Sequence, residues 1–122
     1  MENKDYTVEI LEIIRSNTSP GIMRSRLEDY HANDLAEVFP QLKVSERRKI
    51  CRILDLDMLS DIFEHIDEQE AAEYLDEMDI KKAAAILSAM ETDAVVDVLQ
   101  MIPKEKKNLL IELMDDDARK DM

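Results

Sequence analysis

The sequence is poor in residues that bend, end or cross-link a chain. Its 122 residues include one glycine, three prolines, one cysteine and no tryptophan, and 4% of them are aromatic. Few glycines and prolines mean few β-turns, and the abundant Leu, Ile, Glu, Asp, Lys and Ala favour helices, which excludes an all-β fold. A lone cysteine, Cys51, cannot form a disulfide within the chain. We therefore expect one all-α domain over residues 1–122, whose apolar content of 45% suffices for a single core.

Targeting and membrane-spanning segments are also missing. The N-terminus lacks the basic start and apolar stretch of a signal peptide. The longest near-candidate for a membrane span, residues 83–90, is eight residues long and contains Ser88, whereas a span needs about 18 apolar residues. We therefore expect a cytosolic chain that does not itself cross a membrane, which leaves open that it is a soluble part of a membrane protein.

Basic residues are absent from one long segment, and most of the net charge of −13 comes from that segment. Residues 1–54 hold nine acidic and nine basic side chains, whereas residues 55–80, here called the acidic window, hold eleven acidic and no basic ones. An acidic chain does not attract phosphate backbones, so nucleic-acid binding is disfavoured. A solvated helix face is the ordinary explanation of a charge run. Such faces usually mix both signs, so the acidic window favours a cation or a basic partner.

A twelve-residue repeat runs from His31 towards the end of the chain. Apolar residues recur at positions five, eight, nine and twelve of each unit, and residues that start helices recur at position one. Position eight is apolar or aromatic in every full unit: Val38, Ile50, Ile62, Tyr74, Ile86, Val98 and Leu110. Twelve residues make about three turns plus 120°, so a continuous helix would carry this stripe around its axis. The chain must therefore turn once per unit.

Each unit is expected to form one short helix that begins after position one. Asp67 with Glu70 suits a capping box, and Phe39-Pro40 is expected to end the first repeat helix early. Helices this short are unstable alone and must bury their stripes against neighbours. This predicts an armadillo-like α-solenoid over residues 31–122.

Two capping helices are expected ahead of the repeat, within residues 5–30. One covers residues 6–15, and the other starts at Ser19 with Pro20 in its first turn. At the other end the chain stops inside an eighth unit, residues 115–122, without an apolar closure. This suggests a cut chain, or one whose next element lies elsewhere.

Two pairs of aspartates occupy positions three and seven, about 190° away from the apolar stripe. They are Asp57 with Asp61 in unit three and Asp93 with Asp97 in unit six. Carboxylates four residues apart repel each other, and a hydrated divalent cation or a basic partner would offset that repulsion. Ordinary solvation is the alternative, because Asp57 and Asp93 lie near helix amino ends, where the helix dipole favours acids.

The remaining reactive residues favour structural roles. His31, His65 and Cys51 do not form a spaced set of transition-metal ligands, and Cys51 sits at the inward position nine without an evident base. No nucleophile with an acid or base partner is evident, so an enzyme, such as a small hydrolase, is not expected. A small basic cluster consists of Arg47, Arg48, Lys49 and Arg52. It would bind the acidic window of another copy or another acidic surface, or it is simply solvated.

The units HANDLAEVFPQL and DEQEAAEYLDEM, taken with the repeat phase, resemble the cytosolic N-terminal domain of the MgtE magnesium transporters. Nearly the whole chain takes part, from about Tyr6 to the end, although Ala32 stands where the family usually has proline. The resemblance implies a right-handed superhelix on the cytosolic side of the cell membrane. In the family this domain is followed by CBS modules and a transmembrane channel, which this chain lacks, and the full-length transporter is expected to be a homodimer.

The resemblance also implies a function. In the family, high intracellular Mg²⁺ bridges acidic residues of the N domain and the CBS modules, and this closes the pore. By repeat phase, Asp61, Asp93 and Asp97 fall where the family's interdomain magnesium ligands lie, and Asp57 adjoins them. The implied role is a non-enzymatic regulatory domain with weakly bound Mg²⁺ as its cofactor and a CBS domain as its partner. Other acids would deepen the negative potential: Glu64, Glu68, Glu73, Asp76 and Glu77.

The competing hypothesis is a protein-interaction scaffold that does not depend on metal. Short-helix superhelices also resemble parts of the flagellar motor switch protein, whose concave surface binds a partner. Mg²⁺ keeps several waters and often takes only one or two carboxylates from a protein, so a weak half-site completed by another domain is chemically reasonable. A response to Mg²⁺ therefore separates the two hypotheses.

Overall fold

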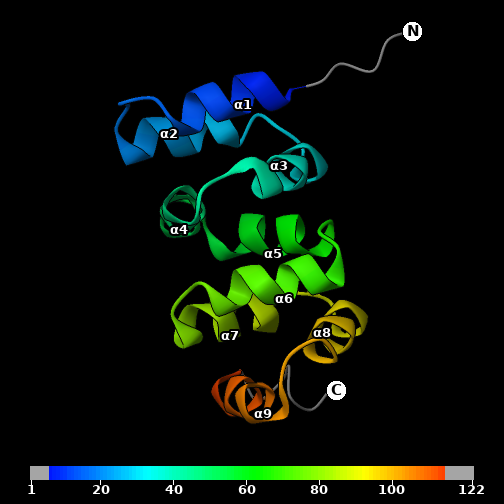
Figure 1. Cartoon of the computed structure of the whole chain (residues 1–122). Coiled ribbons are helices and arrows are strands. Elements are labelled where there is room, and N and C mark those ends of the chain that lie inside the picture. Colours follow the sequence, from blue (N-terminus) through cyan, green and yellow to red (C-terminus); the bar gives the residue numbers. More distant parts are fainter. Residues whose placement is uncertain (1–5, 115–122) are drawn as a thin grey trace, which may run out of the picture. The chain divides into compact units, whose positions relative to one another are not determined.

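The computed structural model describes residues 6–114, which form nine α-helices and one 3₁₀ helix and contain no strand (Figure 1). The chain divides into two compact units, residues 1–55 and residues 56–122. The all-α class predicted from the composition is confirmed. The partial eighth repeat unit, residues 115–122, lies outside the described residues.

The first unit contains the two helices expected ahead of the repeat and the first two repeat helices. Its elements are α1 (Thr7–Ile14), α2 (Pro20–Leu27), α3 (Ala32–Val38), the 3₁₀ helix η1 (Phe39–Gln41) and α4 (Val44–Ile53). Helix α1 packs against α2 and α3, and α2 packs against α4. Ser19 caps α2 as predicted, because its Oγ accepts a hydrogen bond from Ile22 N at 3.4 Å. Helix α3 ends at Val38, and Phe39-Pro40 continues as η1, so the early end is also confirmed.

The second unit consists of five further repeat helices. They are α5 (Leu56–Glu64), α6 (Glu68–Asp76), α7 (Ile80–Ala89), α8 (Thr92–Leu99) and α9 (Lys104–Leu113). Helix α5 packs against α7 and α7 against α9, while α6 packs against α8. The helices of this unit therefore form two rows, one of odd-numbered and one of even-numbered helices, as in a solenoid. The right-handed superhelix stays a prediction.

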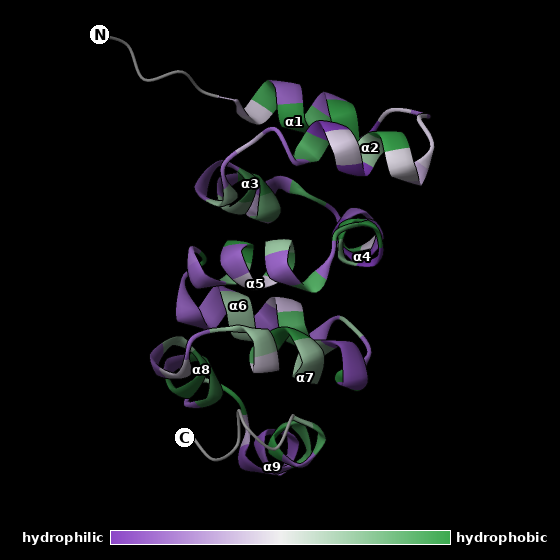
Figure 2. Cartoon of the chain, turned by 180° about the vertical axis from the view of Figure 1, so that it is seen from behind, coloured by the Kyte–Doolittle hydropathy of each residue, from purple (hydrophilic) through white to green (hydrophobic). Residues whose placement is uncertain are grey.

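The twelve-residue phase matches the burial of the side chains. Every residue at position eight is buried, from Val38 to Leu110, and those at positions nine and twelve are buried or half-buried. In Figure 2 most helices carry hydrophilic and hydrophobic residues on different sides. Position six is buried as well wherever it holds a small residue. This burial was not predicted from the sequence. Those residues are Ala36, Ser60, Ala72 and Ala84.

The repeat helices begin directly after position one, as predicted. The Asp67 carboxylate accepts a hydrogen bond from Gln69 N at 3.2 Å, and the Asp79 carboxylate accepts one from Lys81 N at 3.0 Å. The expected capping box between Asp67 and Glu70 is thus wrong, because the Asp67 carboxylate accepts from the amide of Gln69 and not from that of Glu70. Both aspartates still satisfy a first-turn amide that has no partner within the helix.

The turns between helices use ordinary backbone conformations. Several position-twelve residues are extended after a helix, for example Leu54 with φ −80° and ψ 149° and Met90 with φ −83° and ψ 161°. No described residue has a positive φ. The described helices therefore end without the left-handed glycine that commonly follows a helix. This explains how a sequence with one glycine forms many short helices.

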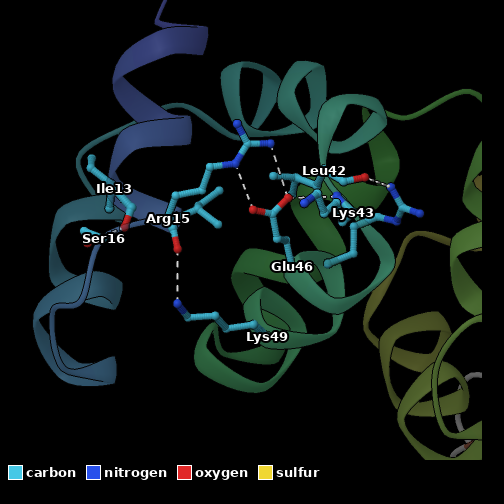
Figure 3. Close-up of polar contacts among 9 residues, drawn as sticks. Ile13, Arg15, Ser16, Leu42, Lys43, Glu46 and Lys49 are labelled. Carbon is cyan, nitrogen blue, oxygen red and sulfur yellow. Dashed lines mark hydrogen bonds and ion pairs between the residues drawn. The ribbon is translucent and has the colours of Figure 1, made fainter.

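An ion pair joins α1 to α4 in the first unit (Figure 3). Arg15 Nε donates to Glu46 Oε2 at 2.8 Å, and Glu46 Oε1 accepts from Lys43 N at 2.8 Å. Lys49 Nζ donates to the Ile14 carbonyl oxygen at 3.1 Å, at the end of α1. The hydrogen bond from Arg15 and that from Lys43 lower the pKa of Glu46 below its ordinary value of 4.5.

Acid should weaken the first unit through Glu46. Because its pKa is lowered by folding, its stabilising contribution is complete above about pH 4.5 and is lost as the pH falls through the lowered value. The free energy of unfolding of Glu46→Gln should therefore fall below that of the wild type at pH 7, and the gap should narrow as the pH falls below about 4.5. Urea denaturation at a series of pH values measures it. Glu37→Gln, at an exposed site on α3, is the control and should track the wild type. A gap that does not change with pH would contradict the assignment.

Candidate metal-binding face

The four candidate aspartates lie on two helices of the second unit, and all four are exposed, as positions three and seven predict. Asp57 and Asp61 are on α5, and Asp93 and Asp97 are on α8. Asp57 and Asp93 lie in the first turns of their helices. No ion pair joins any of the four carboxylates to a described residue. Their charges are therefore uncompensated within residues 6–114.

The two pairs of aspartates belong to different rows of helices in the second unit. Helix α5 belongs to the odd-numbered row and α8 to the even-numbered row, because three repeat units separate them. Within residues 6–114 no three or more His, Cys, Asp or Glu side chains lie close enough to hold a metal ion together. The described residues thus offer exposed carboxylates in pairs and no complete coordination shell.

One hydrogen bond links the two aspartate-bearing helices. Glu64, the last residue of α5, accepts from Glu91 N at 2.9 Å through its Oε2, and Glu91 directly precedes α8. Asp61 lies one turn before Glu64, and Asp93 lies two residues after Glu91. This link therefore brings the ends of the helices that carry Asp61 and Asp93 together. From the sequence, Glu64 was expected only to deepen the negative potential, because a contact with a residue 27 positions away leaves no local signal.

Other acids of the window also have structural partners. Asp67 and Asp79 cap helices, Asp76 pairs with Lys106 of α9, and Asp55 pairs with Arg24 in the first unit at 2.9 Å. The acidic window is therefore not uniformly available to a cation. The outward aspartates of α5 remain as its uncompensated acids together with exposed glutamates such as Glu68 and Glu73.

The histidines and the cysteine occupy structural positions. His65 Nδ1 lies 2.8 Å from the Asp61 carbonyl oxygen, so the proton on Nδ1 lets the ring satisfy a carbonyl at the end of α5. His31 is exposed and precedes α3, and Cys51 is buried in α4. His31 thus lies at a helix start and His65 on the surface, and neither has a nearby set of metal ligands among the described residues.

The basic cluster is divided in its roles. Arg47 donates from Nη1 to the carbonyl oxygens of Leu42 at 2.6 Å and Phe39 at 3.1 Å, and so satisfies the backbone at the η1 turn. Lys49 contacts the end of α1, as described above, whereas Arg48 and Arg52 are exposed. The role of Arg47 was missed, although its place at position five, where most units are apolar, was a signal.

Hard oxygen ligands, exposure and an uncompensated negative charge suit a hydrated divalent cation such as Mg²⁺. Exposed carboxylates are able to contact such a cation directly or through its waters. None of the described helices has the length and apolar character needed to cross a membrane.

Comparisons with known proteins place this geometry in a family. A family model described as the MgtE intracellular N domain matches residues 30–122. No curated protein matches the sequence. The chain is similar to a crystal structure of the soluble part of a magnesium transporter, with 27% identity and a TM-score of 0.83, over 94% of this chain and 46% of that one.

A second similar structure is that of the cytosolic domain of the Mg²⁺ channel MgtE in complex with ATP. It is 26% identical to this chain, with a TM-score of 0.79, over 93% of this chain and 47% of that one. The chain thus spans about half the length of the solved relatives it matches.

Proposed function

The chain belongs to the MgtE intracellular N domain family, and from this membership we propose that it is the cytosolic regulatory domain of a magnesium transporter. It senses intracellular Mg²⁺ through its outward aspartates and docks to a CBS domain to gate the channel. The observation that carries the proposal is the pair of exposed, uncompensated aspartates on each of α5 and α8. The proposed ligands are Asp61, Asp93 and Asp97, with Asp57 beside Asp61.

Mg²⁺ dependence follows from electrostatics. An acidic face approaching an acidic partner is repelled within about one Debye length, roughly 8 Å at physiological salt. A divalent cation between the faces turns that repulsion into attraction, and loses only part of its hydration shell. High Mg²⁺ then favours the docked state and low Mg²⁺ favours separation. The isolated chain supplies half of the ligands, so it binds Mg²⁺ weakly.

The proposal extends to the whole transporter. The partner is a CBS domain of the same chain or of the other subunit in a homodimer, and the membrane is reached only through the full-length protein. The role is non-enzymatic, because the domain works by docking. The short helices are proposed to continue as a right-handed superhelix that presents the aspartates of α5 and α8 to the partner.

A magnesium titration tests this function. In ¹⁵N-labelled chain at constant ionic strength, millimolar Mg²⁺ should shift the amide resonances around Asp61, Asp93 and Asp97. Asp93→Asn with Asp97→Asn should remove the shifts on α8, because these changes delete both charges at positions that bury nothing. Glu105→Gln, at an exposed site on α9, is the control and should leave them intact.

A half-site needs its partner for a full response, so the second measurement adds the transporter's CBS module. Light scattering should show association in millimolar Mg²⁺ that EDTA reverses and that the Asp93→Asn, Asp97→Asn variant loses. Association that is equal with Mg²⁺ and EDTA would support the metal-independent scaffold instead. A chain with flat resonances and no Mg²⁺-dependent association would refute the sensing proposal.

A further inference from the structure

A hollow of about 490 Å³ in the first unit has only basic residues among its charged lining side chains. It is lined by Pro20, Gly21, Arg24, Lys49, Arg52 and Ile53, from α2 and α4. The volume is within the range of small-molecule pockets, about 300–1,000 Å³. We propose that this hollow binds a small, soluble phosphate-bearing anion.

Arg24 is held in place at the hollow by two carboxylates. Its Nε donates to Glu28 Oε1 at 3.1 Å, and its Nη2 donates to Asp55 Oδ2 at 2.9 Å. A guanidinium carries five N–H donors, so these bonds orient the group and leave three donors unused. The two carboxylates also offset its charge, so the net positive charge of the hollow comes from the other cations.

Lys49 and Arg52 supply that net charge. Lys49 uses one of its three donors on the Ile14 carbonyl oxygen. Arg52 is exposed and makes no hydrogen bond or ion pair to a described residue. Its planar guanidinium is able to contact two oxygens of one phosphate at once. Together these three cations have more unused N–H donors than the two oxygens of a carboxylate can accept. The more numerous oxygens of a phosphate suit them better.

Gly21 adds an independent observation, because it is the one glycine in the sequence and it lines this hollow. Its φ is not positive, and a Cβ atom placed on it would meet nothing within 4 Å. Neither the backbone nor the packing therefore requires glycine here, although glycine in a helix is unfavourable relative to alanine. A ligand that approaches the backbone closely does require it. The Gly21 N–H lies in the first turn of α2, where amides lack a partner within the helix.

This site is separate from the proposed magnesium face, which belongs to the second unit, so the two are tested independently. The full 122-residue chain, ¹⁵N-labelled and kept in EDTA, is titrated with sodium pyrophosphate at constant ionic strength, with sodium chloride as the reference. Pyrophosphate should shift the Gly21 amide and the Arg24 and Arg52 Nε resonances. Arg52→Gln should weaken binding by about tenfold or more, because it removes a charge-assisted contact.

Gly21→Ala separates a ligand role from a structural one. It should leave the melting temperature unchanged or raise it, because alanine favours a helix and nothing occupies the space, yet it should weaken pyrophosphate binding. Arg26→Gln is the control: Arg26 is on the same helix but lines another hollow, and its loss should not change binding.

Three results would overturn the proposal. The first is a set of shifts that sodium chloride reproduces, and the second is binding that survives both Arg52→Gln and Gly21→Ala. The third is an absence of response to pyrophosphate together with binding to a poly-glutamate peptide or to phosphatidylglycerol vesicles. That last result would assign the hollow to an acidic protein or a lipid surface instead of a soluble phosphate.

Discussion

Phe63→Ala should remove about 3–5 kcal/mol from the free energy of unfolding, the cost of deleting a buried aromatic ring. Phe63 is 1% exposed on α5, at position nine of its repeat unit. Its loss leaves a cavity among short helices that have little stability of their own and depend on packing against their neighbours. Proteins of this size are stable by about 5–15 kcal/mol, so the expected loss is a large fraction of the total. Urea denaturation followed by far-ultraviolet circular dichroism measures it.

Two further variants keep this prediction decidable if Phe63→Ala does not fold. Phe63→Leu should lose less than half as much, because it retains most of the apolar volume. Leu109→Ala, at a site on α9 that is 51% exposed, should change the stability by about 0.5 kcal/mol or less. Equal losses at Phe63 and Leu109 would mean that position nine does not carry the core.

Ala84→Leu should destabilise the second unit by about 1–3 kcal/mol, although it adds apolar volume to a good helix former. Ala84 is 1% exposed at position six of α7, a helix that packs against α5, α6 and α9. A leucine there forces neighbouring helices apart or takes a strained rotamer. The shift in the thermal midpoint measures the effect.

Ala89→Leu is the matched control, because it makes the same change on the same helix at an exposed residue. It should leave the thermal midpoint almost unchanged. If the two variants melted together, the small residues at position six would not set the spacing between helices.

The helices and their inward faces were predictable because both follow from a local period. Position eight alone identified seven buried residues, and position one identified the helix starts. Position seven likewise predicted the exposure of Asp61 and Asp97. Burial is decided by which side of a short helix faces its neighbours, and the twelve-residue phase contains that information. Position six was missed because alanine and serine carry little apolar signal.

The links between distant residues were not predictable from the same pattern. Glu64 meets the Glu91 amide 27 residues away, and Arg15 meets Glu46 31 residues away. Each contact depends on the order in which helices stack, and a single sequence has no local mark of that order. The same limit applies to the metal-binding face: the repeat places Asp61 and Asp93 outward but not relative to each other.

The extended turns at position twelve have a consequence for how such chains change length. Because these turns need no glycine and no positive φ, a unit can be gained or lost without special turn chemistry. In the second unit, however, odd and even helices occupy different rows, so losing twelve residues would move every later helix into the opposite row. A change of twenty-four residues restores the arrangement. Insertions and deletions tolerated within this unit should therefore come in pairs of helices.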